Sequence, residues 1–249
     1  MRIVFLTTDD PLYLPELFRR VLAERGRDTE AVYVVPPLYK NQTTLEAARR
    51  YHRTFGTGDT LRLARRTAGA KLRRRSIAAV CERAGVPCSA VRDVNDPAFV
   101  EHLRRTGLDV LVSVSCPQIF KQPLLEVASK GCLNVHGALL PHYRGVMPSF
   151  WMLANGEERA GVSVYFVNEQ IDAGELCGQR AFPIRPDDTL ASFLQRSKGV
   201  AAELLLEVLD RVEEGTVTRE PLDLAQGSYY SWPEPGAVRR FRAAGRRVW

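Results

Sequence analysis

Three polar side chains in the second half of the chain could together stabilise a developing negative charge and handle a proton. Asn134 and His136 are two residues apart in an apolar, strand-like run, so their side chains should point to the same face. The amide is a neutral hydrogen-bond donor, and an imidazole titrates near about pH 6.5. The pair therefore suits stabilisation of an oxyanion together with proton transfer. Asp172 follows in a later loop and could orient His136 or accept a proton.

Other reactive side chains nearby have simpler interpretations. Cys116 could act as a nucleophile, but a thiol at the apolar end of a strand more commonly packs, and we expect no covalent role for it. His142 is expected to be exposed. Arg144 either positions its own loop or contacts substrate, and the sequence does not separate these two roles.

Two motifs surround the three side chains: NVHGALLPHYRG from Asn134 to Gly145 and VNEQIDAG from Val167 to Gly174. With these motifs the chain resembles the formyltransferases that use 10-formyltetrahydrofolate, most clearly over residues 108–186 and more loosely over 1–215. The resemblance implies that Asn134, His136 and Asp172 are catalytic. It also implies that 10-formyltetrahydrofolate is the formyl donor and that no metal is needed.

The resemblance further implies where the donor and the acceptor lie. The family holds folate through backbone and apolar groups after one strand and in the loop that carries the aspartate. The implied folate contacts are Cys116, Pro117, Gln118, Ile119, Phe120, Val167, Asn168, Glu169 and Ile171. The implied substrate loop contains Leu140, Pro141, Arg144 and Gly145.

The motifs depart from the family pattern at two places. Gly137 and Ala138 stand where the family usually has Pro-Ser, which removes a hydroxyl and a rigid ring. Thr7-Thr8-Asp9-Asp10 stands where the glycinamide ribonucleotide enzymes carry a glycine-rich phosphate loop, and two carboxylates would repel a phosphate.

Strands and helices alternate along the part of the chain that must position these residues. Short β-rich apolar runs predict strands at 2–7, 30–35, 86–91, 108–115, 132–135, 162–166 and 176–184. Helical spacing of apolar residues predicts helices at 14–22, 76–84, 96–106, 149–154 and 189–214. The alternation predicts an α/β fold with a doubly wound, mostly parallel sheet flanked by helices, a formyltransferase-like Rossmann variant.

The domain organisation follows from these elements. Residues 1–215 are expected to form the catalytic domain, with a basic helical insertion at about 38–75 that is broken around Gly56 and Gly58. Residues 216–249 are expected to form a short, turn-rich C-terminal extension, whose aromatic residues pack against the body.

The charge of the chain is unevenly distributed. The net charge is +6, but residues 40–75 hold eleven Lys/Arg against two acidic residues, which leaves −3 on the rest. The chain is therefore not a uniformly basic nucleic-acid binder. The basic segment is expected to be a solvated helical surface, with an anionic substrate or partner as the alternative.

Composition excludes several classes of protein. The 249 residues are 45% hydrophobic and 26% charged, as in ordinary globular domains. The five cysteines are odd in number and no two are spaced as CxxC, which argues against a disulfide framework or structural zinc. No apolar stretch is long enough for a membrane span and the start does not resemble a secretory signal, so a cytoplasmic protein without a membrane partner is expected.

The first functional hypothesis is transfer of a formyl group to the amine of a small biosynthetic acceptor, such as a nucleotide-linked amino sugar. It rests on the motifs, the missing phosphate loop and the few residues that follow Gly215. The alternatives are formylation of methionyl-tRNA, which the basic segment supports, hydrolysis of formyltetrahydrofolate by water, and folate binding without catalysis. The oligomeric state stays open, with a homodimer among the options.

Overall fold

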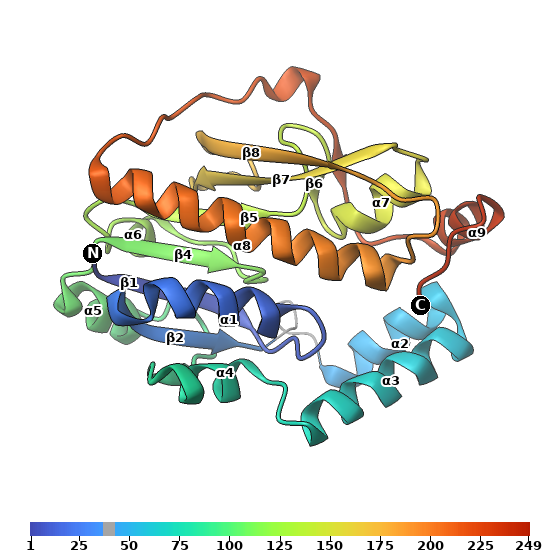
Figure 1. Ribbon diagram of the computed structural model, residues 1–249, viewed down its shortest axis with the longest axis horizontal. Coiled ribbons are helices and arrows are strands. Elements are labelled where there is room, and N and C mark those ends of the chain that lie inside the picture. Colours follow the sequence, from blue (N-terminus) through green and yellow to red (C-terminus); the bar gives the residue numbers. More distant parts are fainter. Residues whose placement is uncertain (37–42) are drawn as a thin grey trace.

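A seven-stranded sheet runs through the molecule (Figure 1). The computed structural model describes residues 1–36 and 43–249. The strand order is β3-β2-β1-β4-β5-β7-β8. These strands are β1 (Ile3–Thr8), β2 (Thr29–Val35), β3 (Cys88–Ala90), β4 (Val110–Val114), β5 (Cys132–His136), β7 (Arg159–Phe166) and β8 (Leu176–Pro183). The first five strands in this order are parallel, and the pairs β5–β7 and β7–β8 are antiparallel, so the predicted mostly parallel sheet is confirmed.

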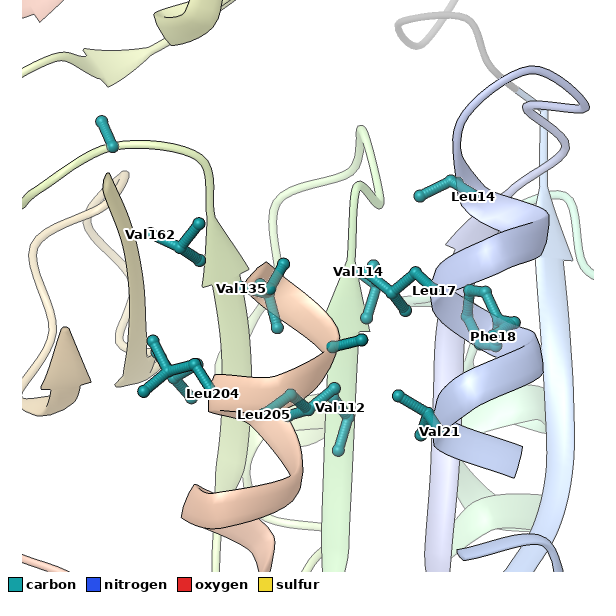
Figure 2. Close-up of a cluster of buried hydrophobic side chains, with 14 of the residues drawn as sticks. Leu14, Leu17, Phe18, Val21, Val112, Val114, Val135, Val162, Leu204 and Leu205 are labelled. Carbon is teal, nitrogen blue, oxygen red and sulfur yellow. The ribbon is translucent and has the colours of Figure 1, made fainter. Parts of the chain in front are cut away.

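Helices cover both faces of the sheet, as predicted. The helices α1 (Leu14–Arg25), α4 (Ile77–Ala84) and α8 (Leu190–Glu214) contribute to the larger buried cluster on one face. The helices α5 (Pro97–Thr106) and α6 (Gln122–Leu125) contribute to a separate cluster on the other. Figure 2 shows Leu17 of α1 beside Val114 of β4, and Leu205 of α8 beside Val112 of the same strand. Burial of each such side chain stabilises the fold by about 1.5–3 kcal/mol.

The chain reverses its direction of winding at the β1–β4 pair. Strands β2 and β3 lie on one side of β1, whereas β4 and β5 lie on the other. In open α/β sheets a crevice forms outside the carboxyl ends of the strands at such a point. Asn134 and His136 are therefore carried on the strand next to β4, towards the same carboxyl-end edge.

A pair of basic helices projects beyond that edge of the sheet (Figure 1). They are α2 (Thr44–Phe55) and α3 (Thr57–Leu72), and they meet at Gly56, whose φ of 85° favours glycine. A helical insertion broken at this glycine is the predicted arrangement. Of the predicted segment, residues 38–42 lie outside the described part of the chain.

The tail is more ordered than the sequence predicts. Helix α9 (Pro235–Ala243) and the short strand β9 (Tyr229–Tyr230) lie in a segment expected to be turn-rich, and β9 pairs with β6 (Arg144–Gly145). The sequence also missed α6 and the 3-10 turns η1 (Gly26–Asp28) and η2 (Leu224–Gln226), whereas α7 (Pro148–Ala154) was predicted. The predicted strand at 86–91 is shorter, at Cys88–Ala90. Elements of two to four residues carry too little periodicity to be recognised locally.

No helix within residues 1–36 and 43–249 is long and apolar enough to cross a bilayer.

Candidate active site

Three neighbouring strands present one polar side chain each to the same face of the sheet. Asn134 of β5 is paired in register with Ser113 of β4 and with Tyr165 of β7. Residues at paired positions of adjacent strands point to one face, so their side chains form a row across the sheet. Ser113 and Tyr165 are buried, and Asn134 is half-buried.

Tyr165 links Asn134 and Asp172, which lie far apart in the sequence. Asn134 Nδ2 donates a hydrogen bond of 2.9 Å to the Tyr165 hydroxyl, which donates one of 2.8 Å to Asp172 Oδ1. Burial, followed by the negative charge of Asp172, raises the pKa of Tyr165 well above its ordinary value. The phenol therefore stays protonated and keeps donating to the carboxylate.

Asp172 is held from two sides. Its Oδ1 accepts from Tyr165 and its Oδ2 accepts a hydrogen bond of 2.7 Å from the backbone N–H of Gly145. Its backbone has a φ of 49°, a left-handed conformation that aspartate tolerates better than most residues. Only 8% of Asp172 is exposed, so these two donors replace water around a buried carboxylate.

His136 is orientated through both ring nitrogens. Its Nε2 lies 2.8 Å from the carbonyl oxygen of Tyr143, and because a carbonyl can only accept, Nε2 carries a proton. Its Nδ1 lies 3.5 Å from Asp172 Oδ2. The imidazole therefore presents Nδ1, the nitrogen that can take up a further proton, to the carboxylate.

A cleft of about 280 Å³ lies beside this network. All nine residues that resemblance implied for folate line it, as do Asn134, Asp172 and Gly145. The sequence did not single out five further lining residues: Ser113, Val146, Tyr165, Gln170 and Tyr229. Ser113 and Tyr165 stand opposite Asn134 on the neighbouring strands. They can be recognised as site residues only when the register of these strands is known.

Four predicted site residues do not line the cleft. His136 lies behind it, with 6% of its surface exposed. Leu140 is buried, and its N–H donates to Ser163 Oγ. Pro141 accepts from the N–H of Ser228, and Arg144 pairs in β6 with Tyr229. These two residues connect the predicted substrate loop to the tail through their backbones.

The walls of the cleft suit a flat aromatic ligand. Ile119, Ile171 and Tyr229 are 59%, 45% and 52% exposed, and all three line the cleft, so they offer it apolar surface. An apolar slot with a few polar groups at its base is typical of small-molecule sites. The folate predicted from the motifs matches this chemistry.

The tail is hydrogen-bonded to the loop that borders the site. The N–H groups of Arg144 and Val146 donate to the carbonyls of Ser228 and Tyr230, at 2.9 and 2.8 Å. The N–H of Tyr143 donates to Ser228 Oγ at 2.8 Å. Residues 143–146 supply the carbonyl that binds His136 and the N–H that binds Asp172, so the tail supports both contacts.

The remaining candidates from the sequence have structural surroundings. Burial raises the pKa of the Cys116 thiol to about 11, so it is a neutral thiol rather than a thiolate nucleophile near pH 7. His142 is exposed, as expected. Within the described residues no group of three or more His, Cys, Asp or Glu side chains could hold a metal ion.

Comparisons of sequence place the chain among known proteins. A family model described as formyl transferase matches residues 1–209. The methionyl-tRNA formyltransferases of Geobacter metallireducens and Geotalea uraniireducens are each 32% identical to the chain, over 92% of its length and 64% of theirs. That of Trichlorobacter lovleyi is 31% identical over 73% of the chain and 60% of its own length. The chain thus spans about 60–64% of the length of these relatives.

Solved structures share the fold at lower identity. A sugar N-formyltransferase from Shewanella sp FDAARGOS_354 superposes with a TM-score of 0.61 at 19% identity, over 93% of this chain and 76% of that one. Glycinamide ribonucleotide transformylase 1 from Symbiobacterium toebii superposes with a TM-score of 0.62 at 19% identity, over 90% and 94%. The predicted formyltransferase-like fold is confirmed.

Proposed function

The chain belongs to the formyl transferase family, and from this premise we propose that it transfers the formyl group of 10-formyltetrahydrofolate to the amine of an acceptor. The observation that carries the proposal is the connected set of Asn134, Tyr165, Asp172 and His136 at the edge of an apolar cleft. An amide donor, a carboxylate and an imidazole in contact are the groups that acyl transfer to an amine requires.

The donor would bind in the cleft between residues 116–120 and 167–172. The exposed side chains of Ile119, Ile171 and Tyr229 would cover its aromatic rings, and the polar row at the base would face its formyl group. When bound, the donor supplies an activated formyl carbon that an amine can attack.

Asn134 would stabilise negative charge on the formyl oxygen. One N–H of its amide is used by Tyr165, and the other makes no hydrogen bond to a described residue and belongs to a side chain that lines the cleft. Tyr165 holds the amide in place and therefore preorganises the donor. Loss of one such donor typically slows a reaction by about 10²–10³-fold.

Asp172 and His136 would handle the proton that the attacking amine loses, and that proton would pass to the nitrogen of the departing tetrahydrofolate as its bond to the formyl carbon breaks. Asp172 reaches the cleft directly, whereas His136 is reached through Asp172 Oδ2. A proton accepted at this edge can therefore be stabilised between the carboxylate and Nδ1, while Nε2 stays bonded to Tyr143. His136 would thus act behind the carboxylate, rather than as the direct oxyanion donor that the sequence suggested.

For the acceptor we favour methionyl-tRNA over a small amine. The named relatives at 31–32% identity are methionyl-tRNA formyltransferases. The expectation of a small acceptor rested partly on the small number of residues after position 215. Because the chain spans 60–64% of the length of those relatives, that number is no argument against methionyl-tRNA. With this acceptor the reaction belongs in the cytoplasm, where tRNA is charged.

Release of tetrahydrofolate in the presence of different acceptors tests the proposal. Purified protein and 10-formyltetrahydrofolate are incubated with methionyl-tRNA, with nucleotide-linked amino sugars, or with no acceptor. Tetrahydrofolate and formylmethionyl-tRNA should form only in the first mixture. Product with an amino sugar would favour the small acceptor, and formate without any amine would show a hydrolase.

A substitution links the activity to the network. His136→Ala should abolish turnover and leave the affinity for a folate analogue nearly unchanged, because His136 does not line the cleft. Unchanged turnover would remove His136 from the mechanism.

A further inference from the structure

Two of the five cysteines meet away from the catalytic site. Cys81 lies in α4, and Cys88 begins β3, the strand at one edge of the main sheet. Helix α4 ends at Gly85, where the chain turns back, and the N–H of Val86 donates to the carbonyl of Cys81 at 3.0 Å. Cys81 belongs to the larger buried cluster, and Cys88 packs against that cluster. The turn after α4 therefore places the two side chains together.

The two thiols are hydrogen-bonded to each other, with the Cys81 S–H as donor and the Cys88 sulfur as acceptor. This bond lowers the pKa of Cys88, against the smaller opposing effects of burial and of the negative charge of Asp9. The same bond, followed by burial, raises the pKa of Cys81. The thiolate of the pair therefore forms at Cys88, while Cys81 keeps its proton.

The two sulfurs also differ in accessibility. A cleft of about 460 Å³ opens at Cys88, which is half-buried, whereas Cys81 is fully buried and does not line this cleft. The cleft is polar on one side, where Lys71, Arg74 and Glu82 line it and Arg74 forms an ion pair of 2.7 Å with Glu82. A small polar molecule that enters from solvent therefore meets the sulfur of Cys88 first.

The other three cysteines have different surroundings. Burial raises the pKa of Cys116 to about 11 and those of Cys132 and Cys177 to about 12. The thiols of Cys132 and Cys177 donate to backbone carbonyls. All five cysteines lie in the described part of the chain, and Cys81 and Cys88 are the two whose side chains contact each other there.

We propose that Cys81 and Cys88 are a redox-active dithiol, which a hydroperoxide converts to a disulfide and a dithiol reductant restores. An accessible sulfur that ionises, beside a second sulfur that can displace its oxidised form, is the arrangement that reversible cysteine oxidation requires. The inference goes beyond the proposed function and does not depend on it, because neither cysteine lines the folate cleft.

The first step is attack by the Cys88 thiolate on one oxygen of the peroxide. An S–O bond forms and the O–O bond breaks, so Cys88 is oxidised to a sulfenic acid as the peroxide is reduced. With hydrogen peroxide, the departing hydroxide takes up the proton that Cys88 released to solvent on ionising, and becomes water. The half-buried position of Cys88 at the cleft gives the peroxide access to this sulfur.

The second step joins the two sulfurs. Cys81 attacks the Cys88 sulfur, the S–S bond forms, the S–O bond breaks, and the hydroxide leaves as water with the proton of Cys81. Oxidation of Cys88 also removes the thiolate to which Cys81 is bonded, the largest cause of the raised pKa of Cys81, so Cys81 becomes easier to ionise. The resulting disulfide ties α4 to the edge strand β3.

Peroxide treatment of the wild-type protein tests the proposal. The reduced full chain is exposed near pH 7 to a small molar excess of hydrogen peroxide, and free thiols are blocked with iodoacetamide at successive times. Trypsin cleaves after Arg83, between the two cysteines, so a Cys81–Cys88 disulfide joins two peptides that mass spectrometry detects without reduction. This disulfide should form at least about tenfold faster than Cys116, the other half-buried cysteine, is oxidised, and dithiothreitol should reverse it.

Two variants separate the roles of the sulfurs. Cys81→Ser should stop at the sulfenic acid of Cys88, which dimedone traps, and Cys88→Ser should leave Cys81 as a thiol. Circular dichroism checks that both variants fold, and the wild-type measurement stands without them. Oxidation of Cys116 at the same rate, a disulfide between two molecules, or a wild-type Cys88 that passes directly to the sulfinic acid would overturn the proposal.

Discussion

The hydroxyl of Tyr165 stands at the centre of the site. It accepts a hydrogen bond from Asn134 and donates one to Asp172, so it fixes the distance between an amide donor and a carboxylate that come from different elements. Tyr165 lines the cleft but is only 3% exposed. We regard it as a positioning residue, because it acts through the two side chains that it joins.

Tyr165→Phe removes that hydroxyl and keeps the ring. We expect kcat to fall about 10- to 100-fold, because small losses of alignment are costly in positioned catalysis. The KM for the folate donor should change little, and the thermal midpoint should stay within a few degrees of wild type. Tyr33→Phe is the matched control, since it removes a hydroxyl that pairs with His102 away from the cleft. Equal kcat in both variants would exclude a positioning role.

The cysteines should differ sharply in reactivity. Hydrogen bonding from Cys81 lowers the pKa of the half-buried Cys88 thiol, whereas burial raises that of Cys116 to about 11 and those of Cys132 and Cys177 to about 12. Because the thiolate is the reactive form, iodoacetamide at pH 8 should label Cys88 first, and Cys116 should react only as the pH approaches 11. Peptide mass spectrometry against time measures the order. Early labelling of Cys116 would restore it as a candidate nucleophile.

At the scale of elements, the short pairing of β6 with β9 supports the catalytic loop. Arg144 and Gly145 are paired with Tyr229 and Tyr230, and the N–H of Tyr143 in the same loop donates a hydrogen bond to Ser228 Oγ. The pairing brings the two backbones so close that a Cβ on Gly145 would lie 2.2 Å from the carbonyl oxygen of Tyr230. A glycine is therefore required here for close approach as well as for its φ of 93°.

Gly145→Ala should separate β9 from the loop. We expect a loss of stability of about 2–4 kcal/mol, from strain at positive φ and from overpacking, together with a large loss of kcat. Gly156→Ala is the control, because Gly156 also has positive φ but its Cβ would meet no atom within 4 Å. The control should cost about 1–2 kcal/mol and leave kcat unchanged. Chemical denaturation and steady-state kinetics compare the two, and similar losses of kcat would contradict the role given to β9.

At the scale of the whole molecule, the tail shares the core of the sheet. Phe241 of α9 is fully buried and packs against Phe150 of α7, at 5.1 Å between ring centres. Ala237, Val238 and Val248 belong to the same buried cluster as α1 and α8. The N–H groups of Leu190 and Ala191, at the start of α8, donate to tail carbonyls. Tail and sheet should therefore unfold together.

Phe241→Ala tests that cooperativity. The truncation should destabilise the protein by about 3–5 kcal/mol and lower a single unfolding transition, because the cavity lies in the shared core. Differential scanning calorimetry would reveal the number of transitions. A separate low-temperature transition for the variant, with the main midpoint unchanged, would instead show that residues 216–249 unfold independently of the sheet.

Local patterns were sufficient for most of the architecture. Periods of two and of 3.6 residues, with glycine or proline at their ends, marked the strands of the main sheet and the helices α1, α4, α5, α7 and α8 near their observed bounds. The motifs around Asn134 and Asp172 were also sufficient to suggest the family, because several residue types had to coincide at fixed spacing.

Long-range contacts decided the rest of the site. In the sequence alone, Tyr165 is one of several strand residues with no sign of a role in the site. The strand register then places it opposite Asn134. Likewise, nothing local links Arg144 to Tyr229 or Phe55 to Trp232, whose contacts join segments far apart along the chain. These pairings are made by backbone hydrogen bonds and ring packing between distant segments, and such contacts leave no periodic trace in either segment alone. The catalytic loop, the tail and the helices α2 and α3 therefore become one assembly only when the chain is folded.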